Sequence, residues 1–324
     1  MASHAVALPG GATSGMPASQ RIALAVMAAA FLVAPLLNIY PVFLMQVMCF
    51  ALFACAFNLL IGYVGLLSFG HAAFFGMASY VSAYSAKAWG FPPELAIISG
   101  TATACVLGLA FGSLAIRRQG IYFAMITLAL AQLVYFFSVQ AKPFTGGDDG
   151  IQAVPRGRMF GVLPLASDMT LYYVVFAIFL AGFLLIYRII HSPFGQVLKA
   201  IRENEPRAIS LGYRVDHYKL AAFVLSATLA GLAGATKAIV FQLASLTDVD
   251  WTMSGEVVLM TLVGGLGTVF GPVVGALTIV TMQNYLATLG AWVTISQGII
   301  FVACVMLFRR GIIGEIGRLI RKPL

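Results

Sequence analysis

The sequence predicts an all-α protein, a polytopic bundle of about ten (eight to ten) transmembrane helices, some of them short or broken by glycines. Its 324 residues are 61% hydrophobic and only 9% charged, whereas a soluble globular domain has about 25% charged residues. The apolar residues form continuous runs of roughly 20, which satisfy their backbone in lipid only as helices. A transmembrane barrel would instead alternate apolar and polar residues.

Seven apolar segments fill most of the chain before residue 250. Residues 1–20 are rich in Ala, Gly, Ser and Pro, which is typical of a disordered tail. A signal peptide is the alternative, but Arg21 precedes the first apolar run and no small-residue cleavage site clearly follows it. The predicted helices cover residues 22–37, 42–61, 66–86, 94–116, 120–140, 170–187 and 219–243.

The end of the chain is less regular. Residues 252–263 are apolar but too short to span a bilayer comfortably. Glycines and a proline then interrupt the run in VGGLGTVFGPVVG (Val263–Gly275). Ten crossings result if the short piece spans the membrane, and eight if the short pieces are re-entrant. The last two predicted helices cover residues 272–288 and 291–308. The whole membrane domain is predicted to cover residues 21–310, and a basic cytoplasmic tail residues 311–324.

The distribution of Lys and Arg predicts the orientation. If Arg21 is cytoplasmic and the crossings alternate, both termini and most basic residues lie inside, as the positive-inside rule requires. The basic residues predicted to lie outside are Lys87, Lys142, Arg156 and Arg158. Acidic residues predicted to lie on the same side offset their charge: Glu94, Asp148, Asp149, Asp168, Asp248 and Asp250. The net charge of +8 is therefore explained by cytoplasmic loops near membrane lipid, and no nucleic-acid partner is expected.

No enzyme chemistry is visible in the sequence. The four cysteines lie inside apolar runs, where they are expected to be core residues and not a disulfide framework or a metal site. The chain lacks a glycine-rich phosphate loop followed by Lys and Ser or Thr, so we expect no ATP binding by the chain itself. We therefore predict no catalytic residue, no metal and no cofactor.

A polar loop, residues 188–219, is the longest interruption between apolar segments on the predicted cytoplasmic side. Pro206 cannot lie inside a helix, so we expect one helix at about 195–204 and a second from Pro206 to a Gly212 cap. Basic and acidic residues are mixed along the loop: Arg188, Lys199, Arg202, Arg207, Arg214, Lys219, Glu203, Glu205 and Asp216.

The second helix of this loop carries a small apolar face, formed by Ala208, Ile209 and Leu211. A short amphipathic helix of this kind suits a groove on a partner protein. The alternative is a solvated basic loop that lies on anionic lipid.

Four polar residues lie within apolar runs and are candidates for a gate or a translocation path: Asn58, Ser68, His71 and Gln132. Polar side chains are unfavourable in lipid and tend to face the protein interior or a water-filled path. Four glycines between residues 62 and 76 permit close helix packing or a broken helix. The alternative is a packed helix pair, with His71 hydrogen-bonded to Asn58 or to a backbone carbonyl.

Two further features concern the predicted outer side. Lys237 and Glu256 are each unfavourable alone in lipid, so we expect them to form a pair, with snorkelling of Lys237 to the headgroups as the alternative. TGGDDG (Thr145–Gly150), within the outer loop 141–169, has the residues of a tight turn. A Ca²⁺ loop is the alternative, although EF-hand spacing is absent.

Four motifs, in order, resemble a known family. AIRENEPRAISLG (Ala200–Gly212) resembles the coupling-helix loop of permease subunits of ABC importers. The family's other motifs are matched at Asn58–Gly76, Thr145–Gly150 and Val263–Gly275, so the resemblance extends from about residue 42 to 308. On these motifs the chain is identified as a LivM-type branched-chain amino acid permease subunit of the LivH/LivM permease family.

The resemblance implies a set of partners and a substrate. It implies two ABC ATPase subunits, a second homologous permease subunit and a periplasmic substrate-binding protein, in the bacterial inner membrane. Leucine, isoleucine and valine are the implied substrates, with urea, short amides or other amino acids as alternatives. Asp148 and Asp149 would help to dock the binding protein. The residues that carry the ATPase-coupling motif are Ala200, Glu203, Asn204, Ala208 and Gly212.

A different class of function is a stand-alone secondary carrier driven by an ion gradient. Such carriers usually place coupling residues near the membrane midplane. No Asp or Glu lies in the middle of a predicted segment, and Glu256 is close to an end, which argues against this class. A non-transporting scaffold would explain the cytoplasmic loop but not the two glycine-broken segments.

Overall fold

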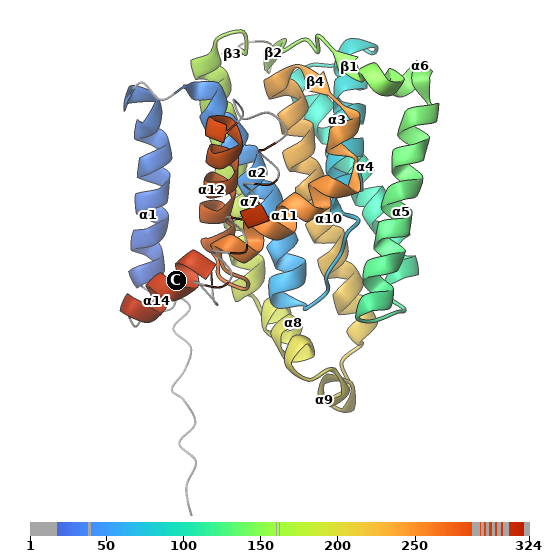
Figure 1. Ribbon diagram of the computed structural model, residues 1–324, viewed down its shortest axis with the longest axis vertical. Helices are drawn as coiled ribbons and strands as arrows, with labels where there is room; N and C mark the ends of the chain where they lie inside the picture. Colours follow the sequence, from blue (N-terminus) through green and yellow to red (C-terminus); the bar gives the residue numbers. More distant parts are fainter. Residues whose placement is uncertain are drawn as a thin grey trace, which may run out of the picture.

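The computed structural model describes residues 18–37, 40–159, 161, 163–286 and 311–320, together with residues 292, 295, 298, 299, 302 and 306. It is an all-α polytopic bundle, so the predicted fold class is confirmed. The long helices run side by side between two ends, which we call the strand end and the loop end (Figure 1). Short strands lie at the strand end; α8 (Pro193–Glu203) and α9 (Glu205–Ser210) form the loop end.

Five of the described helices are long and apolar enough to cross a membrane: α2 (Pro41–Tyr63), α4 (Pro93–Ala115), α5 (Ile121–Gln140), α7 (Asp168–His191) and α10 (Val215–Phe241). An α-helix needs about 20 residues to cross the hydrocarbon layer. The other apolar helices of the bundle are shorter: α1 (Ala18–Val33), α3 (His71–Lys87), α11 (Trp251–Gly264) and α12 (Gly271–Leu286). The number of crossings therefore stays a prediction.

Several predicted boundaries were wrong by about a turn. The third helix begins at His71 and not at 66, because residues 64–70 are not helical and Gly65 has a φ of +83°. The first helix begins at Ala18, inside the predicted tail, where Gln20 accepts a 2.7 Å hydrogen bond from the Tyr187 hydroxyl of α7.

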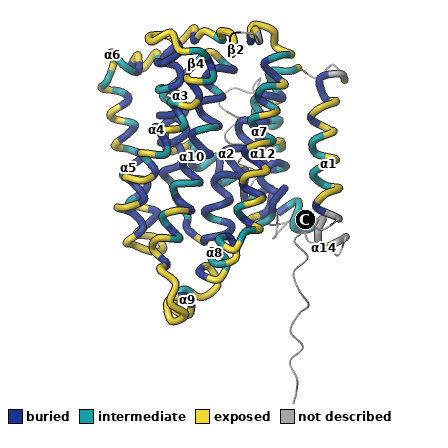
Figure 2. The backbone as a smooth tube through the Cα atoms, turned by 180° about the vertical axis from the view of Figure 1, so that it is seen from behind, coloured by how far each residue is buried: buried dark blue, intermediate teal, exposed yellow. Residues whose placement is uncertain are grey.

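The centre of the bundle consists of α2 and α10, the most buried of the long helices (Figure 2). Small residues allow close approach around α10. A Cβ atom added to Gly108 of α4 would lie 2.6 Å from Cβ of Ala227 of α10, and one added to Gly112 would lie 2.8 Å from Cδ1 of Leu220. Helices in lipid associate through such small-residue packing, since lipid supplies no hydrophobic drive between them.

The predicted outer loop, residues 141–169, contains more regular structure than its turn motif indicates. It holds α6 (Lys142–Thr145), a 3₁₀ turn η2 (Gly147–Asp149) and three strands. These strands and one after α10 make two antiparallel pairs, β1 (Ile151–Gln152) with β4 (Leu243–Ala244) and β2 (Arg158–Met159) with β3 (Leu163–Pro164). Two-residue strands carry too little periodicity for a sequence prediction.

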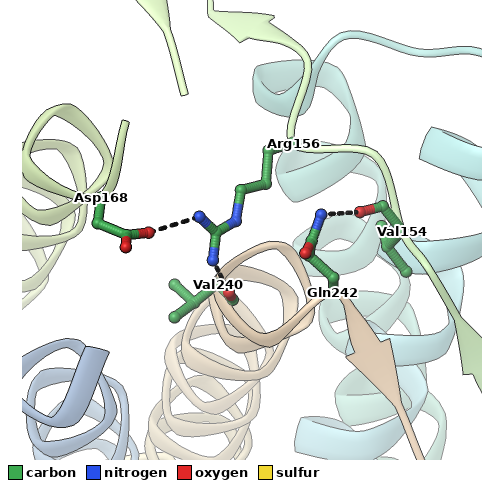
Figure 3. Close-up of polar contacts among 5 residues, drawn as sticks. All are labelled: Val154, Arg156, Asp168, Val240 and Gln242. Carbon is green, nitrogen blue, oxygen red and sulfur yellow. Dashed lines mark hydrogen bonds and ion pairs between the residues drawn. The ribbon is translucent and has the colours of Figure 1, made fainter. Parts of the chain in front are cut away.

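Arg156 and Gln242 attach this loop to the helix ends (Figure 3). The Arg156 guanidinium donates to Oδ1 of Asp168, 2.7 Å away at the start of α7, and to the carbonyl of Val240 at 2.9 Å. The Gln242 amide donates to the Val154 carbonyl at 3.1 Å. The strand end is thus a fixed surface and not a free loop.

Among the described residues after α12, one stretch departs from the prediction. Residues 311–320 form an amphipathic helix, α14 (Gly311–Ile320), which packs on α11 and α12, where we expected only a basic tail. Other predictions fall outside the described residues: the tail 1–17, most of the helix 291–308, Arg309, Arg310, Cys304 and the last four residues.

Candidate functional site

The loop between α7 and α10 forms two capped helices, as the sequence predicts. Ser192 caps α8, its hydroxyl accepting from the Gly195 amide at 3.3 Å, and Asn204 caps α9, its side-chain oxygen accepting from the Arg207 amide at 3.1 Å. Pro206 lies in the first turn of α9, and Gly212 ends the unit with a φ of +87°. The two helices project beyond the bundle at the loop end (Figures 1 and 2).

The predicted apolar face of α9 is divided between two sides. Ala208 is 2% exposed and packs on Ile201 and Val215, so it holds α9 against α8 and α10. Ile209 and Leu211 point outward and are 57% and 68% exposed. The prediction of one shared face was wrong for two reasons. Residues 208 and 209 are about 100° apart on a helix, and Leu211 lies beyond the last residue of α9, Ser210. The surface offered to a partner therefore contains Ile209 and Leu211 without Ala208.

Glu205 attaches α9 to the rest of the bundle. Its Oε1 atom lies 2.7 Å from Nζ of Lys219 on α10 and accepts from the Gln119 amide, between α4 and α5, at 2.9 Å. From the sequence, Glu205 was expected only as one of the loop's charges, because its partners are 14 and 86 residues away. Of the predicted coupling residues, Ala200, Glu203, Asn204 and Gly212 are exposed and Ala208 is buried.

Asn58 connects the two glycine-rich motifs. Its side-chain amide nitrogen donates to the Thr268 carbonyl at 2.9 Å, and its side-chain oxygen accepts from the Gly267 amide at 3.0 Å. The residue thus satisfies the backbone of the non-helical turn between α11 and α12. Unpaired backbone groups at membrane depth are strongly unfavourable, so Asn58 stabilises the break in this part of the bundle.

His71 lies at the start of α3 in an aromatic enclosure. Its Nε2 atom is 2.9 Å from Oγ of Ser226, which donates to the Ala56 carbonyl at 2.5 Å. The rings of Phe57 and Phe223 lie 5.0 and 6.1 Å from the imidazole, which has no solvent exposure. The alternative of a His71–Asn58 bond was therefore wrong, because the two side chains bond different elements.

The structure shows where the other two candidates for the translocation path, Ser68 and Gln132, lie. Ser68 is buried and its hydroxyl accepts from the Gly70 amide at 3.2 Å, within the turn that precedes α3. Gln132 is half-buried on α5. Their participation in a translocation path stays a prediction.

Lys237 forms a pair with Asp248 in place of the predicted Glu256. Asp248 ends the 3₁₀ turn η3 (Leu246–Asp248), is 1% exposed, and accepts from Nζ of Lys237. The prediction failed because it assigned Asp248 to the outer surface, whereas the chain after β4 returns into the bundle. Glu256, on α11, interacts with the Gln283 side chain of α12.

Comparison with known protein families shows which family this chain belongs to. Residues 39–308 match the family described as "branched-chain amino acid transport system / permease component". The chain belongs to this family. Its members are transport permeases, and the apolar helices agree with a multi-pass membrane protein.

The individual relatives share between 25% and 28% of their aligned residues with this chain. The chain is 25% identical, over 73% of its length, to the high-affinity branched-chain amino acid transport system permease protein LivM of Salmonella typhimurium. It is 28% identical, over 68% of its length, to the ribose import permease protein RbsC of Bacillus subtilis, of which it covers 70%. A probable LivM of Methanocaldococcus jannaschii is 27% identical over 58% of this chain and 54% of its own length.

The match to the Salmonella protein covers 61% of that relative's length. No solved structure matches the chain.

Proposed function

We propose that this chain is the membrane-spanning permease subunit of an ABC importer that carries branched-chain amino acids across the bacterial inner membrane. The observation that carries the proposal is the α8–α9 unit, a capped and tethered pair of helices that exposes Ile209 and Leu211 at one end of the bundle. Membership of the permease family supports it. Both chain ends would lie on the cytoplasmic side, with the loop end.

The proposed partners at the loop end are two ABC ATPase subunits, one of which binds this chain. A short helix with outward apolar residues fits a groove on such a subunit. Glu205 and Ala208 attach α9 to α10, so a movement of the ATPase would be transmitted into the bundle and not absorbed by a flexible loop. Hydrolysis of ATP belongs to those subunits, and this chain acts as a transport subunit and not as an enzyme.

The strand end would face the periplasm and a substrate-binding protein. Asp148 and Asp149 are exposed there, beside the strand pairs that Arg156 and Gln242 hold in place. A second homologous permease subunit would complete the translocation path, with Asn58, Ser68, His71 and Gln132 as its proposed polar residues. The division of the protein into a tail, a membrane domain and a basic end stays part of this proposal.

The substrate is supported by the relatives' names. Branched-chain amino acid transport is named for LivM and for the family, and ribose import is named for RbsC. Uptake of leucine, isoleucine and valine should be compared with that of ribose, urea and other amino acids.

The ion-coupled carrier is the second candidate, since Asp248 supplies the buried carboxylate that the sequence had not placed in the bundle. Its pairing with Lys237 satisfies the charge structurally, and the family favours the importer. Uptake into vesicles that depends on internal ATP and not on an ion gradient would decide for the importer.

The decisive experiment is co-purification. The chain is expressed with its ATPase subunits and binding protein, extracted in mild detergent, and compared with Gly212→Arg. A Cβ atom added to Gly212 meets no other atom within 4 Å, so the variant tests docking at the surface of the loop. Gly90→Arg is the matched control, because Gly90 also has a positive φ and open surroundings but lies between α3 and α4, at the strand end.

We expect the ATPases to travel with the wild type and with Gly90→Arg and to be lost from Gly212→Arg. If folded ATPase subunits do not bind the wild type, the coupling assignment of the loop fails and the ion-coupled carrier becomes the leading function.

A further inference from the structure

We infer that Arg202 is a positioning residue that joins the cytoplasmic loop to both glycine-rich breaks of the membrane helices. The inference rests on the proposed function and deepens it, because it names the side chain through which movement of the loop would reach the path. Arg202 is in the last turn of α8. It lies within the segment Ala200–Gly212 but is not among the five residues that carry the coupling motif.

The first contact is with the end of α2. Nη1 of Arg202 donates to the carbonyl of Gly62, in the last turn of that helix. The last carbonyls of a helix have no partner within it and carry a partial negative charge. A guanidinium satisfies such a group with a charge-assisted hydrogen bond. The contact therefore fixes α8 against the C-terminus of the most buried helix.

The second contact is with the first glycine break. A Cβ atom on Gly65 would lie 3.2 Å from Cγ of Arg202, closer than most Cβ contacts. Gly65 also has a φ of +83°, which L side chains rarely adopt. The absence of a side chain at Gly65 thus allows the Arg202 stem to lie across the turn that leads to α3.

The third contact is with the second glycine break. A Cβ atom on Gly267 would lie 3.4 Å from Nη1 of Arg202 and 3.3 Å from the Gly62 carbonyl oxygen. Asn58 holds the Gly267 amide from the other side at 3.0 Å. Arg202, Gly62, Gly267 and Asn58 therefore form one unit, in which two turns far apart in the sequence, at Gly65 and Gly267, meet a single loop side chain.

Space for movement lies beside this unit. A cavity of about 530 Å³ is bordered by Gly62, Tyr63, Lys199, Arg202 and Gly267, among others. The guanidinium can therefore be displaced without compressing packed atoms. A shift of α8 would move the end of α2 and the turn before α12 together, because the same nitrogen lies against both.

The test uses the complete importer in proteoliposomes, with ATP hydrolysis and substrate uptake measured on the same sample. Arg202→Met keeps the stem and removes the donor. We expect the ATPase subunits to remain bound and the substrate imported per ATP to fall about tenfold, the effect of losing one charge-assisted hydrogen bond. Arg202→Lys should restore part of this ratio. Arg188→Met, which removes an exposed charge at the same end, should leave it unchanged.

A second measurement does not depend on transport. Leu266, in the turn beside Gly267, is 38% exposed. Leu266→Cys is introduced after the four native cysteines are replaced by alanine, and its labelling rate with a maleimide is measured with and without ATP. With Arg202 present the rate should change on ATP binding, and with Arg202→Met it should not.

An ATP response that persists in Arg202→Met, or an unchanged ratio of import to hydrolysis, would overturn the inference. Loss of the ATPase subunits from Arg202→Met would also overturn it, since Arg202 would then be a docking residue. Failure of the wild type to bind ATPases is a separate result, which removes the proposed function itself.

Discussion

Nζ of Lys237 and the carboxylate of Asp248 form an ion pair inside the bundle, between α10 and the 3₁₀ turn that precedes α11. The Lys237 side chain also lies 6.0 Å from the centre of the Phe75 ring on α3. Helix α11 has only 14 residues, and this pair fixes the point at which the chain enters it. The pair is thus the anchor of the short helix at the strand end.

We predict that Asp248→Ala strongly destabilises the protein. The substitution leaves the ammonium of Lys237, whose side chain is only 13% exposed, without its partner. Breaking a buried pair in this way typically costs about 3–5 kcal/mol. Equilibrium unfolding in mixed detergent micelles measures the change. Lys237→Met should have an effect of similar size.

The double variant Lys237→Met, Asp248→Ala is the control for this pair. Its loss of unfolding free energy should be clearly smaller than the sum of the losses in the two single variants, because neither charge is then left without a partner. Additive losses would show that the two side chains act independently.

The sequence predicts those parts of the fold that depend on neighbours in the chain. Run length and Lys/Arg distribution predicted the long helices and placed loops 141–169 and 188–219 at opposite ends, where Figure 1 shows them. Pro206 and Gly212 predicted the ends of α9. Each of these signals is local, so each is readable without the tertiary structure.

The missed features all depend on contacts between distant segments. Asn58 forms hydrogen bonds to Gly267 and Thr268, which are 209 and 210 positions further along the chain. His71 bonds Ser226, which is 155 positions away. Asp248 was misplaced because a polar stretch after a long helix is the usual pattern of an outer loop, and nothing local shows its return into the bundle. Polar residues within apolar runs mark such sites, but they do not identify the partner.

We predict that Ser226→Ala lowers stability by about 1–3 kcal/mol. The change removes the hydroxyl between His71 and the Ala56 carbonyl and leaves buried polar groups without a partner. Thr228→Ser is the matched control on the same helix, since it keeps the hydroxyl that bonds within α10. Equal stability of Ser226→Ala and wild type would indicate that water reaches His71 and would favour its role in the path.

We predict that Gly108→Leu disrupts the packing of α4 on α10. Even a Cβ atom at this position would lie 2.6 Å from that of Ala227, and overpacking a tight contact typically costs about 1–3 kcal/mol, occasionally more. The monodisperse fraction on size-exclusion chromatography in detergent measures the effect. Gly90→Leu is the control, because no atom lies within 4 Å of its added Cβ; an effect of the same size there would mean that the glycine contact is unimportant.

The last prediction concerns Ile209 and Leu211, which are apolar and exposed at the tip of the loop end. If they enter a groove on an ATPase subunit, Ile209→Glu or Leu211→Glu should weaken its binding by more than about tenfold, because a charge is then buried at the centre of the contact. The stability of the isolated chain should not change, since both side chains are exposed in it. Ile209→Val keeps the apolar contact and should bind nearly as the wild type. Binding of purified ATPase subunits to the immobilised chain measures all three variants. Equal binding by the Glu variants would place the docking surface elsewhere on the loop end and leave these residues to contact lipid.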